Sequence, residues 1–403
     1  MIRIAFAVCV ATLAMAAAAA SAGQGDAAVV RIAVLTQLVD RPPALSNLEP
    51  PPDDSGLLGA RMAIAENNTT GRFMKQRFEV RETVVPADGD AVAAFKALAG
   101  DGYRFIVANL GADTLLRVAD TPEAGKVLIF NAGAADDVLR NEECRANILH
   151  TVPSRAMIAD ALAQYLAWKR WSKWFLVIGR RAEDRLFADA VRRAAKRFGA
   201  RIVAEKTWEF GPDTRRTAQS EVPVFTQDVD YDVLIVADEI GEFGEYLMYR
   251  TWTPRPVAGT QGLVPTSWDR AHEQWGAAQL QSRFLKTFKR RMNQLDYTVW
   301  AAVRAVGEGA TRAASTEFQD IADYILGGKF GLAGFKGQRL TFRRWNGQLR
   351  QPILLATPQA MVSVSPQKGY LHPRSYLDTL GYDEPESRCR RWSEAKGAAR
   401  WSR

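Results

Sequence analysis

Histidine and cysteine are scarce in this chain of 403 residues, which has three of each. No histidine stands near a cysteine in the spacing of a zinc site. The sequence also lacks Gly-x-Ser-x-Gly, His-Glu-x-x-His and phosphate-binding glycine motifs, since His272-Glu273 is followed by Gln-Trp-Gly. We therefore expect no catalytic residue, no metal site and no required cofactor, and predict that the protein is not an enzyme.

Long apolar runs are missing beyond the N-terminus, so no segment has the length of a membrane-spanning helix. The first 22 residues contain Met-Ile-Arg, an apolar Ala/Val run and Ala20-Ser-Ala22, which together are typical of a secretory signal peptide. Cys9 lies inside the apolar run and not at its end, which argues against a lipoprotein anchor. We expect cleavage after Ala22 and an exported, periplasmic protein.

Two cysteines remain beyond this segment, Cys144 and Cys389. An oxidising compartment favours a disulfide between them, and it would close a very long loop. Two unrelated thiols are the alternative.

Acidic residues are fewer than basic ones, and the net charge is +8. The tail from Glu386 onward holds six Lys and Arg against two Glu, so much of the excess lies there. Because a basic chain end frays easily, the charge is weak support for a polyanionic partner, and we expect no nucleic acid.

Strand-like and helix-like stretches alternate over the first 260 residues, in two runs that divide near residues 149–154. Such alternation predicts βαβ units. The predicted fold class is α/β, with two doubly wound parallel-sheet lobes joined by a hinge. We assign residues 23–150 and 297–345 to lobe I, 151–296 and 346–385 to lobe II, and 386–403 to a basic tail. Asn346-Gly347 predicts a hairpin turn.

A proline-dense loop, residues 40–54, follows the first predicted strand and runs into Gly59-Ala-Arg-Met-Ala and Asn67-Asn-Thr-Thr-Gly. The loop after the first strand of an α/β domain borders the ligand crevice. These motifs, followed late in the chain by Leu340-Thr-Phe and Asn346-Gly347, resemble the branched-chain amino acid type of periplasmic binding protein. That resemblance implies the type I periplasmic binding protein fold, a small-molecule ligand and an ABC importer permease as partner. We expect a monomer.

A narrower resemblance rests on residues 40–48, 67–73 and 259–265. These resemble binding proteins associated with alcohol oxidation systems that depend on pyrroloquinoline quinone (PQQ), which implies PQQ as a ligand. The serine pair that holds an amino acid in the wider family is missing from residues 109–115, where Thr114 supplies the one hydroxyl. An amino acid ligand is therefore disfavoured.

Three arginines, Arg180, Arg181 and Arg185, follow a predicted strand and enter a predicted helix. A helix N-terminus at a strand end attracts anions, and guanidinium groups pair well with carboxylates. We expect these arginines to bind the ligand. The alternative is a surface cluster paired with Glu183 and Asp184.

Three more candidates lie in the first lobe. Arg41 stands on the proline-dense loop, where it faces the crevice or pairs with Asp40 or Glu49. Asn109 and Thr114 stand between a strand and a helix, where they donate hydrogen bonds to the ligand or cap the helix.

The last candidates are Trp268 and Arg270, in a loop that also holds His272. A tryptophan can stack on a flat ring while an arginine pairs with its acids; packing in the core is the alternative for the tryptophan.

The sequence thus predicts a receptor that captures a small anionic ligand, PQQ foremost, by hinge closure. One alternative is a receptor for an alcohol-derived organic acid. Another is a non-transport accessory or sensor of a periplasmic quinoprotein system.

Overall fold

The computed structural model describes residues 27–40, 52–209 and 214–390. The expected signal peptide, Arg41 and the end of the basic tail lie outside these ranges. In the part of the chain that the structure describes, no helix is both long and apolar enough to cross a membrane.

Lobe I is built on a five-stranded parallel sheet in the order β2-β1-β3-β4-β5. Its strands are β1 (Ala28–Gln37), β2 (Gln76–Val85), β3 (Phe105–Asn109), β4 (Leu128–Asn131) and β5 (Ile148–His150). Consecutive residues of β1 are buried on opposite faces, with Ile32 and Val34 in one core and Ala33 and Leu35 in another. This continuous apolar run is typical of a parallel sheet covered by helices on both faces.

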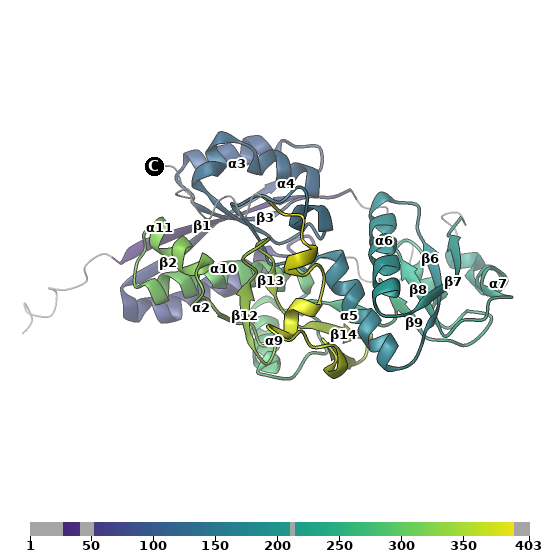
Figure 1. Cartoon of the computed structure of the whole chain (residues 1–403). Helices are drawn as coiled ribbons and strands as arrows, with labels where there is room; N and C mark the ends of the chain where they lie inside the picture. The colour runs from purple at the N-terminus through teal and green to yellow at the C-terminus, as the bar shows by residue number, and fades with distance from the viewer. Residues whose placement is uncertain (1–26, 41–51, 210–213, 391–403) are drawn as a thin grey trace, which may run out of the picture.

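Helices cover both faces of this sheet (Figure 1). One face carries α2 (Leu57–Met74), α9 (Ala277–Phe288), α10 (Gln294–Ala313) and α11 (Phe318–Leu326), and the other carries α3 (Ala91–Gly100) and α4 (Ala112–Ala119). Helices α2 and α10 approach so closely that a Cβ at Gly59 would lie 2.0 Å from the carbonyl oxygen of Asp296. The Gly-Ala-x-x-Ala motif therefore marks a helix contact that only glycine permits.

Lobe II holds a four-stranded parallel sheet in the order β7-β6-β8-β9. Its strands are β6 (Lys173–Ile178), β7 (Arg201–Thr207), β8 (Val233–Ala237) and β9 (Val257–Gly259). One face packs against α5 (Arg155–Trp168) and α6 (Ala182–Arg197), and the other against α7 (Thr214–Thr226) and α8 (Gly244–Leu247). The two predicted doubly wound parallel lobes are therefore confirmed.

The chain passes between the lobes near residues 150–152, 266–268 and 350–353. Beside these crossings, β10 (Val264–Thr266), β14 (Ile353–Ala356) and β15 (Met361–Ser365) form an antiparallel sheet against α5. On the lobe I side, β12 (Arg339–Phe342) pairs with β11 (Leu332–Ala333) and with β13 (Leu349–Arg350). Asn346-Gly347 forms the turn between β12 and β13, as the sequence predicts.

One segment packs in a different lobe from the one assigned by sequence. Residues 268–292 were placed in lobe II, yet Trp268, Ala277, Phe284 and Met292 all lie in the lobe I core. The apolar side chains of α9, including Leu280, belong to the lobe I core, and sequence order alone does not reveal this. The first stretch of lobe II therefore ends near residue 266 and not at residue 296.

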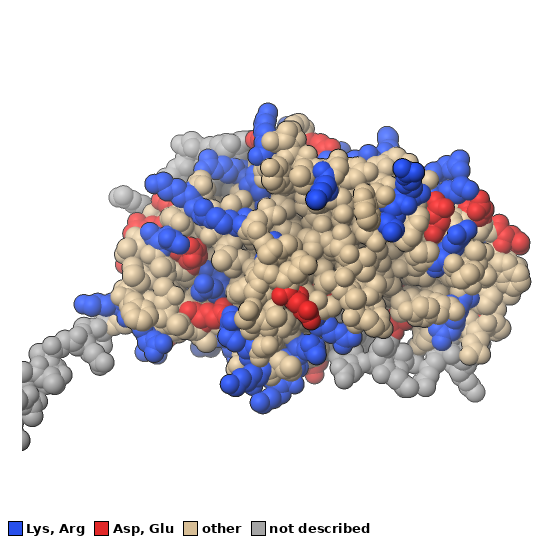
Figure 2. All heavy atoms as spheres, turned by 90° about the horizontal axis from the view of Figure 1, so that it is seen from below, with Lys and Arg blue, Asp and Glu red and all other residues tan. Residues whose placement is uncertain are grey.

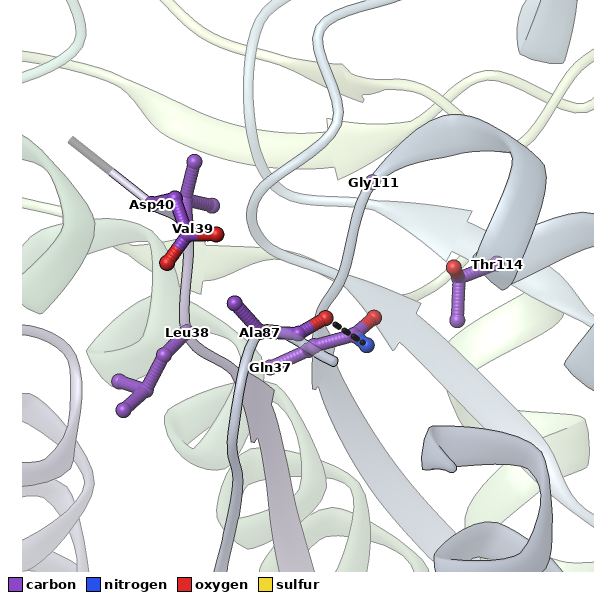
Figure 3. A pocket seen from close by; sticks show the side chains of 7 residues that line it. All are labelled: Gln37, Leu38, Val39, Asp40, Ala87, Gly111 and Thr114. Carbon is purple, nitrogen blue, oxygen red and sulfur yellow. Dashed lines mark hydrogen bonds between the residues drawn. The ribbon is translucent and has the colours of Figure 1, made fainter. Parts of the chain in front are cut away.

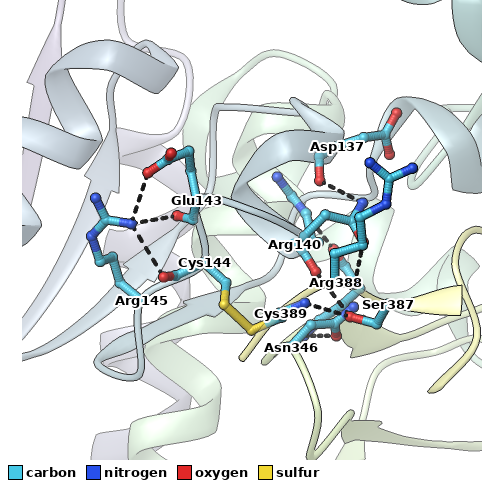
Figure 4. Close-up of a disulfide and its surroundings, with 11 residues drawn as sticks. Asp137, Arg140, Glu143, Cys144, Arg145, Asn346, Ser387, Arg388 and Cys389 are labelled. Atoms are coloured by element: carbon cyan, nitrogen blue, oxygen red, sulfur yellow. Dashed lines mark hydrogen bonds and ion pairs between the residues drawn. A yellow bond between two sulfur atoms is a disulfide. The ribbon is translucent and has the colours of Figure 1, made fainter. Parts of the chain in front are cut away.

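The C-terminal segment folds back along both lobes in three short 3-10 turns, η3 (Lys368–Tyr370), η4 (Tyr376–Thr379) and η5 (Glu384–Glu386). Cys389 forms a disulfide with Cys144 of lobe I, with the two Cα atoms 5.6 Å apart (Figure 4). Residues 386–390, assigned by sequence to the tail, are therefore attached to the body of the protein.

Candidate functional site

A hollow of about 330 Å³ opens at the carboxyl end of the lobe I sheet (Figure 3). Strand order reverses there, because β1 lies between β2 and β3. Ligands of doubly wound domains bind at such switch points. The lining residues come from the end of β1 and the segment after it, from the loop after β2, and from the start of α4: Gln37, Leu38, Val39, Asp40, Ala87, Gly111 and Thr114.

Helix α4 begins at this hollow without a side-chain cap. Gly111 is its N-cap residue and makes no side-chain hydrogen bond, and a Cβ placed on Gly111 would meet no atom within 4 Å. Thr114, in the first turn, accepts a hydrogen bond from Nη2 of Arg117 at 3.0 Å and keeps its own hydroxyl proton for donation. The backbone N–H groups of the first turn and this hydroxyl together suit a carboxylate.

The sequence analysis missed Gln37, which shapes one wall of the hollow. Its Nε2 donates to the carbonyl oxygens of Ala87 at 3.1 Å and Gly89 at 3.0 Å, joining the end of β1 to the loop after β2. Asn109, a predicted ligand residue, ends β3 and is half-buried. Its Oδ1 would be 2.4 Å from a Cβ on Gly133, so its side chain lies against the loop after β4.

The corresponding switch point of lobe II lies between β6 and β8, where the predicted arginines stand. Arg180 donates from Nε to the carbonyl oxygen of Trp208 at 3.2 Å and also to that of Glu209. Arg181 pairs through Nη2 with Oε1 of Glu242 at 2.7 Å. Arg185 is exposed on the first turn of α6. Arg181 thus forms an ion pair within the protein, as the alternative reading of the sequence has it, but its partner is Glu242 and not Glu183 or Asp184.

Carboxylates of the chain itself occupy the amide donors at this switch point. Asp184 accepts hydrogen bonds from the backbone nitrogens of Arg181 at 3.1 Å and Glu239 at 2.8 Å. Asp238 accepts from three successive nitrogens, those of Glu242, Phe243 and Gly244, at 2.7–2.9 Å. An external anion would have to displace these carboxylates, so the predicted anion site at the start of α6 is already filled.

Burial and neighbouring charge both act on Asp184. Its side chain lies in the lobe II core, and this burial raises its pKa to about 6, while the backbone hydrogen bonds oppose the shift and the charges of Asp238 and Glu239 support it. Burial beside Asp238 also raises the pKa of Glu245. The lobe II rim thus gathers carboxylates, which disfavours an anion and favours a cationic or hydrogen-bond-donating group.

Arg155, at the start of α5, joins the two rims and was missed by the sequence analysis. Its guanidinium makes two hydrogen bonds of 2.7 Å to Glu239 of lobe II and an ion pair of 3.1 Å to Asp136 of lobe I. Its side chain is 5% exposed. Burial lowers its pKa, but the hydrogen bonds and charges of the two carboxylates outweigh burial and raise it. The arginine stays charged and links the lobes beside the cleft.

Glutamine side chains fasten the hinge segments to one another. Gln351 donates to the carbonyl oxygen of Thr151 at 2.8 Å and accepts from Nζ of Lys336 at 2.7 Å. Gln348 donates to the carbonyl oxygen of His150 at 3.2 Å. Burial lowers the pKa of Lys336 well below its usual range. The first and third crossings are therefore held together, and movement between the lobes must pivot about them.

The last predicted ligand residues lie away from both switch points. Trp268 is buried, stacks on Tyr297 with ring centroids 4.6 Å apart, and contacts His272 edge-on. It packs in the lobe I core, the alternative weighed for it, and offers no ring face to a ligand in this structure. Arg270 is exposed and donates to the carbonyl oxygen of Pro358 at 2.8 Å.

The charged surface shows no single basic patch on the face drawn in Figure 2, where Lys and Arg lie around a broad uncharged area with Asp and Glu among them. Within the described ranges, no group of three or more His, Cys, Asp and Glu side chains is placed to hold a metal ion. Lobe I thus offers amide and hydroxyl donors at the start of α4, whereas the corresponding switch point of lobe II holds carboxylates.

The sequence matches the family model described as "Periplasmic binding protein" over residues 51–217, less than half of the chain. No curated protein matches the chain.

Solved structures match along most of the chain. A periplasmic ligand-binding protein of a branched-chain amino acid ABC transporter from Burkholderia xenovorans has a TM-score of 0.71 and 16% identity, covering 90% of this chain and 100% of its own. A periplasmic binding protein from Burkholderia mallei has a TM-score of 0.65 and 16% identity, covering 90% and 99%. An ABC transporter substrate-binding protein from Desulfitobacterium hafniense, in complex with Leu, has a TM-score of 0.60 and 13% identity, covering 83% and 99%. This chain therefore has the fold of the type I periplasmic binding proteins.

Proposed function

We propose that the protein is a periplasmic solute-binding protein, exported by its N-terminal segment, that delivers a small ligand to the permease of an ABC importer. It binds its ligand and does not transform it. The lobes close on the ligand by rotation about the hinge, and the closed shape is what the permease recognises.

The division of the chain into two lobes joined by short crossings is the observation that carries this proposal. Each lobe has its own sheet and core, and the connections between them are short crossings fastened by Gln348 and Gln351. Such an assembly allows rigid lobes to move about a fixed pivot. The similar solved structures include binding proteins of amino acid transporters, which supports the same class of function.

The ligand that fits lobe I carries a carboxylate. The uncapped start of α4 and the hydroxyl of Thr114 supply donors beside a hollow of suitable size, and a negative group is stabilised at a helix N-terminus. PQQ is the first ligand to test, because it carries three carboxylates and because the narrower sequence resemblance implies it.

A second ligand class, the amino acids, is favoured by the lobe II rim. Glu239 and Glu242 are paired with Arg155 and Arg181, but Glu245 near the end of β8 has Asp238 as its charged neighbour, so a ligand bearing an ammonium group beside its carboxylate would find a negative group in lobe II and helix donors in lobe I. An amino acid ligand, which the missing serine pair disfavours, thus becomes a candidate again. The three carboxylates of PQQ would need cationic partners, and Arg180 and Arg181 already donate to acceptors in the protein.

Calorimetric titration of the purified protein tests both classes, with PQQ, a panel of amino acids and a panel of alcohol-derived organic acids as ligands. We expect one class to bind, and Thr114→Val to weaken its binding about tenfold, which corresponds to about 1.4 kcal/mol. Thr121→Val, at a hydroxyl outside the hollow that bonds to Val118, is the matched control and should leave affinity unchanged. Absence of heat with all three panels would contradict the proposed function. Recovery of a quinoprotein and no permease in a periplasmic pull-down would favour the accessory alternative.

A further inference from the structure

The C-terminal segment, residues 376–390, crosses from one lobe to the other after the hinge crossings are complete (Figure 1, yellow). We call this segment the strap. It begins against the hinge, where Asp378 pairs with Arg343 at 2.9 Å and with Arg350 at 2.8 Å. It then contacts lobe II and ends on lobe I. Its two anchors differ in kind.

The lobe II anchor is a cluster of ions and hydrogen bonds on α6. Glu386 lies 3.4 Å from Arg193 and 3.5 Å from Arg197. Both arginines also donate to the carbonyl oxygen of Gly381, at 3.1 and 2.7 Å, and both pair with the buried Asp160 of α5. Because Glu386 is exposed, its pairs are weak and open readily in water.

The lobe I anchor is covalent. Cys389 is bonded to Cys144, in the segment between β4 and β5 (Figure 4). Beside it, the backbone nitrogen of Arg388 donates to Oδ1 of Asn141 at 3.3 Å, and its guanidinium pairs with Glu142 at 2.6 Å. This end of the strap therefore stays on lobe I whatever the lobes do.

The short distance along the chain between these anchors limits their separation. Glu386 and Cys389 are three residues apart, and three extended residues span about 10 Å. Once Glu386 is released, the next contact with α6 is at Tyr382, whose ring centroid lies 4.2 Å from the guanidinium of Arg193. Tyr382 is seven residues from Cys389, which allows about 24 Å. The two lobe II contacts thus set two different limits on how far the lobes can separate.

We infer that the strap is a fourth connection between the lobes, fixed to lobe I by the disulfide and held to lobe II by releasable ion pairs, and that it restricts the opening of the ligand-free protein. The inference rests on the proposed function in one respect, the movement of the lobes, and it does not depend on which ligand binds. It assigns to the disulfide a role in setting the open state of the receptor, beyond stabilising the fold.

Distances between the lobes in the ligand-free protein test the inference. Spin labels on non-cysteine unnatural residues at exposed positions Lys96 of α3 and Gln219 of α7 leave the disulfide intact. Pulsed electron resonance then compares wild type with the double variant Cys144→Ser/Cys389→Ser and with Glu386→Gln. We expect both variants to shift the distribution to longer distances and to broaden it, the double variant more.

Glu384→Gln is the matched control, because it removes the same charge from the same 3-10 turn and this residue makes no ion pair with α6. It should keep the wild-type distribution. Circular dichroism checks that each variant folds. If the double variant does not fold, the distances in Glu386→Gln alone decide whether the strap restricts opening. Wild-type distances in the folded variants would overturn the inference, even where the melting temperature falls. This test uses no ligand titration, so a failure of the inference can be distinguished from a failure of the proposed function.

Discussion

The two switch points have the same topology and opposite chemistry. In lobe I, α4 starts at Gly111 with no side-chain cap, beside a hollow. In lobe II, Asp184 and Asp238 occupy the amide donors where α6 and α8 begin. Position at a strand end is therefore not enough to make an anion site. The amide donors must also lack a partner in the protein, and among the described residues no side chain caps the start of α4.

The largest expected effect comes from the residue that joins the two rims. Arg155→Ala leaves Glu239 and Asp136 without their buried partner, and breaking a buried pair is strongly destabilising. We expect the free energy of unfolding to fall by about 3 kcal/mol in urea denaturation. Arg185→Ala, at an exposed position of the next helix, should change it by less than about 0.5 kcal/mol. Equal stabilities of the two variants would contradict the linking role of Arg155.

Alanine substitutions at two glycines allow a direct comparison of the filled switch point of lobe II with the open one of lobe I. A Cβ at Gly179 of lobe II would lie 2.1 Å from Oδ2 of Asp184, whereas one at Gly111 of lobe I meets nothing within 4 Å. We expect Gly179→Ala to cost about 2 kcal/mol of stability through overpacking, and Gly111→Ala to cost at most about 1 kcal/mol as a change of N-cap residue. Thermal and urea unfolding measure both. The reverse order would show that the lobe I hollow is filled and the lobe II site is open.

The pH dependence of stability reports on Asp184, which fills the amide donors of the lobe II switch point. Because the folded-state pKa of Asp184 is raised to about 6, folded protein holds a proton between about pH 4 and pH 6 that the unfolded chain has released. This residue's contribution to the free energy of unfolding therefore decreases as pH rises through that window, by on the order of 1 kcal/mol after allowance for solvent screening. Asp184→Asn removes the contribution, so the difference between variant and wild type should change across the window. A difference that stays constant from pH 4 to pH 7 would contradict the raised pKa.

The smallest expected effect concerns the arginine that the sequence singled out. Arg180 donates to the carbonyl oxygens of Trp208 and Glu209, so Arg180→Ala should change ligand affinity less than twofold. Thr114→Val is expected to weaken affinity about tenfold. Titration of the two variants with the same ligand sharpens the comparison. A larger loss for Arg180→Ala would place the anion site in lobe II after all.

Local pattern was enough to predict the two lobes, most strands of the sheets and the turn at Asn346-Gly347. Those features depend on apolar periodicity and turn residues a few positions apart. The disulfide was predictable for another reason, since Cys144 and Cys389 are the two cysteines beyond the first 22 residues. The lobe of α9 was not predictable, because an amphipathic helix does not indicate which core it covers.

The candidate site was predicted less well, because its contacts join residues far apart in sequence. Arg181 pairs with Glu242, 61 residues away, and Arg155 with Glu239, 84 residues away. From the sequence, near neighbours such as Glu183 were the expected partners of these arginines. Thr114 lines the hollow, because its position at the start of a helix after β3 depends on local order alone, and its role in ligand binding stays a prediction.

If the protein is a periplasmic receptor as proposed, mass spectrometry of the protein released gently from the periplasm would identify the small molecule that it retains, and this is the decisive experiment for the proposed function. We expect a carboxylate-bearing molecule, PQQ or an amino acid, at one per chain, and its loss from a Thr114→Val variant washed under the same conditions. A bound molecule without a carboxylate, or equal retention by wild type and variant, would contradict an anchor at the start of α4.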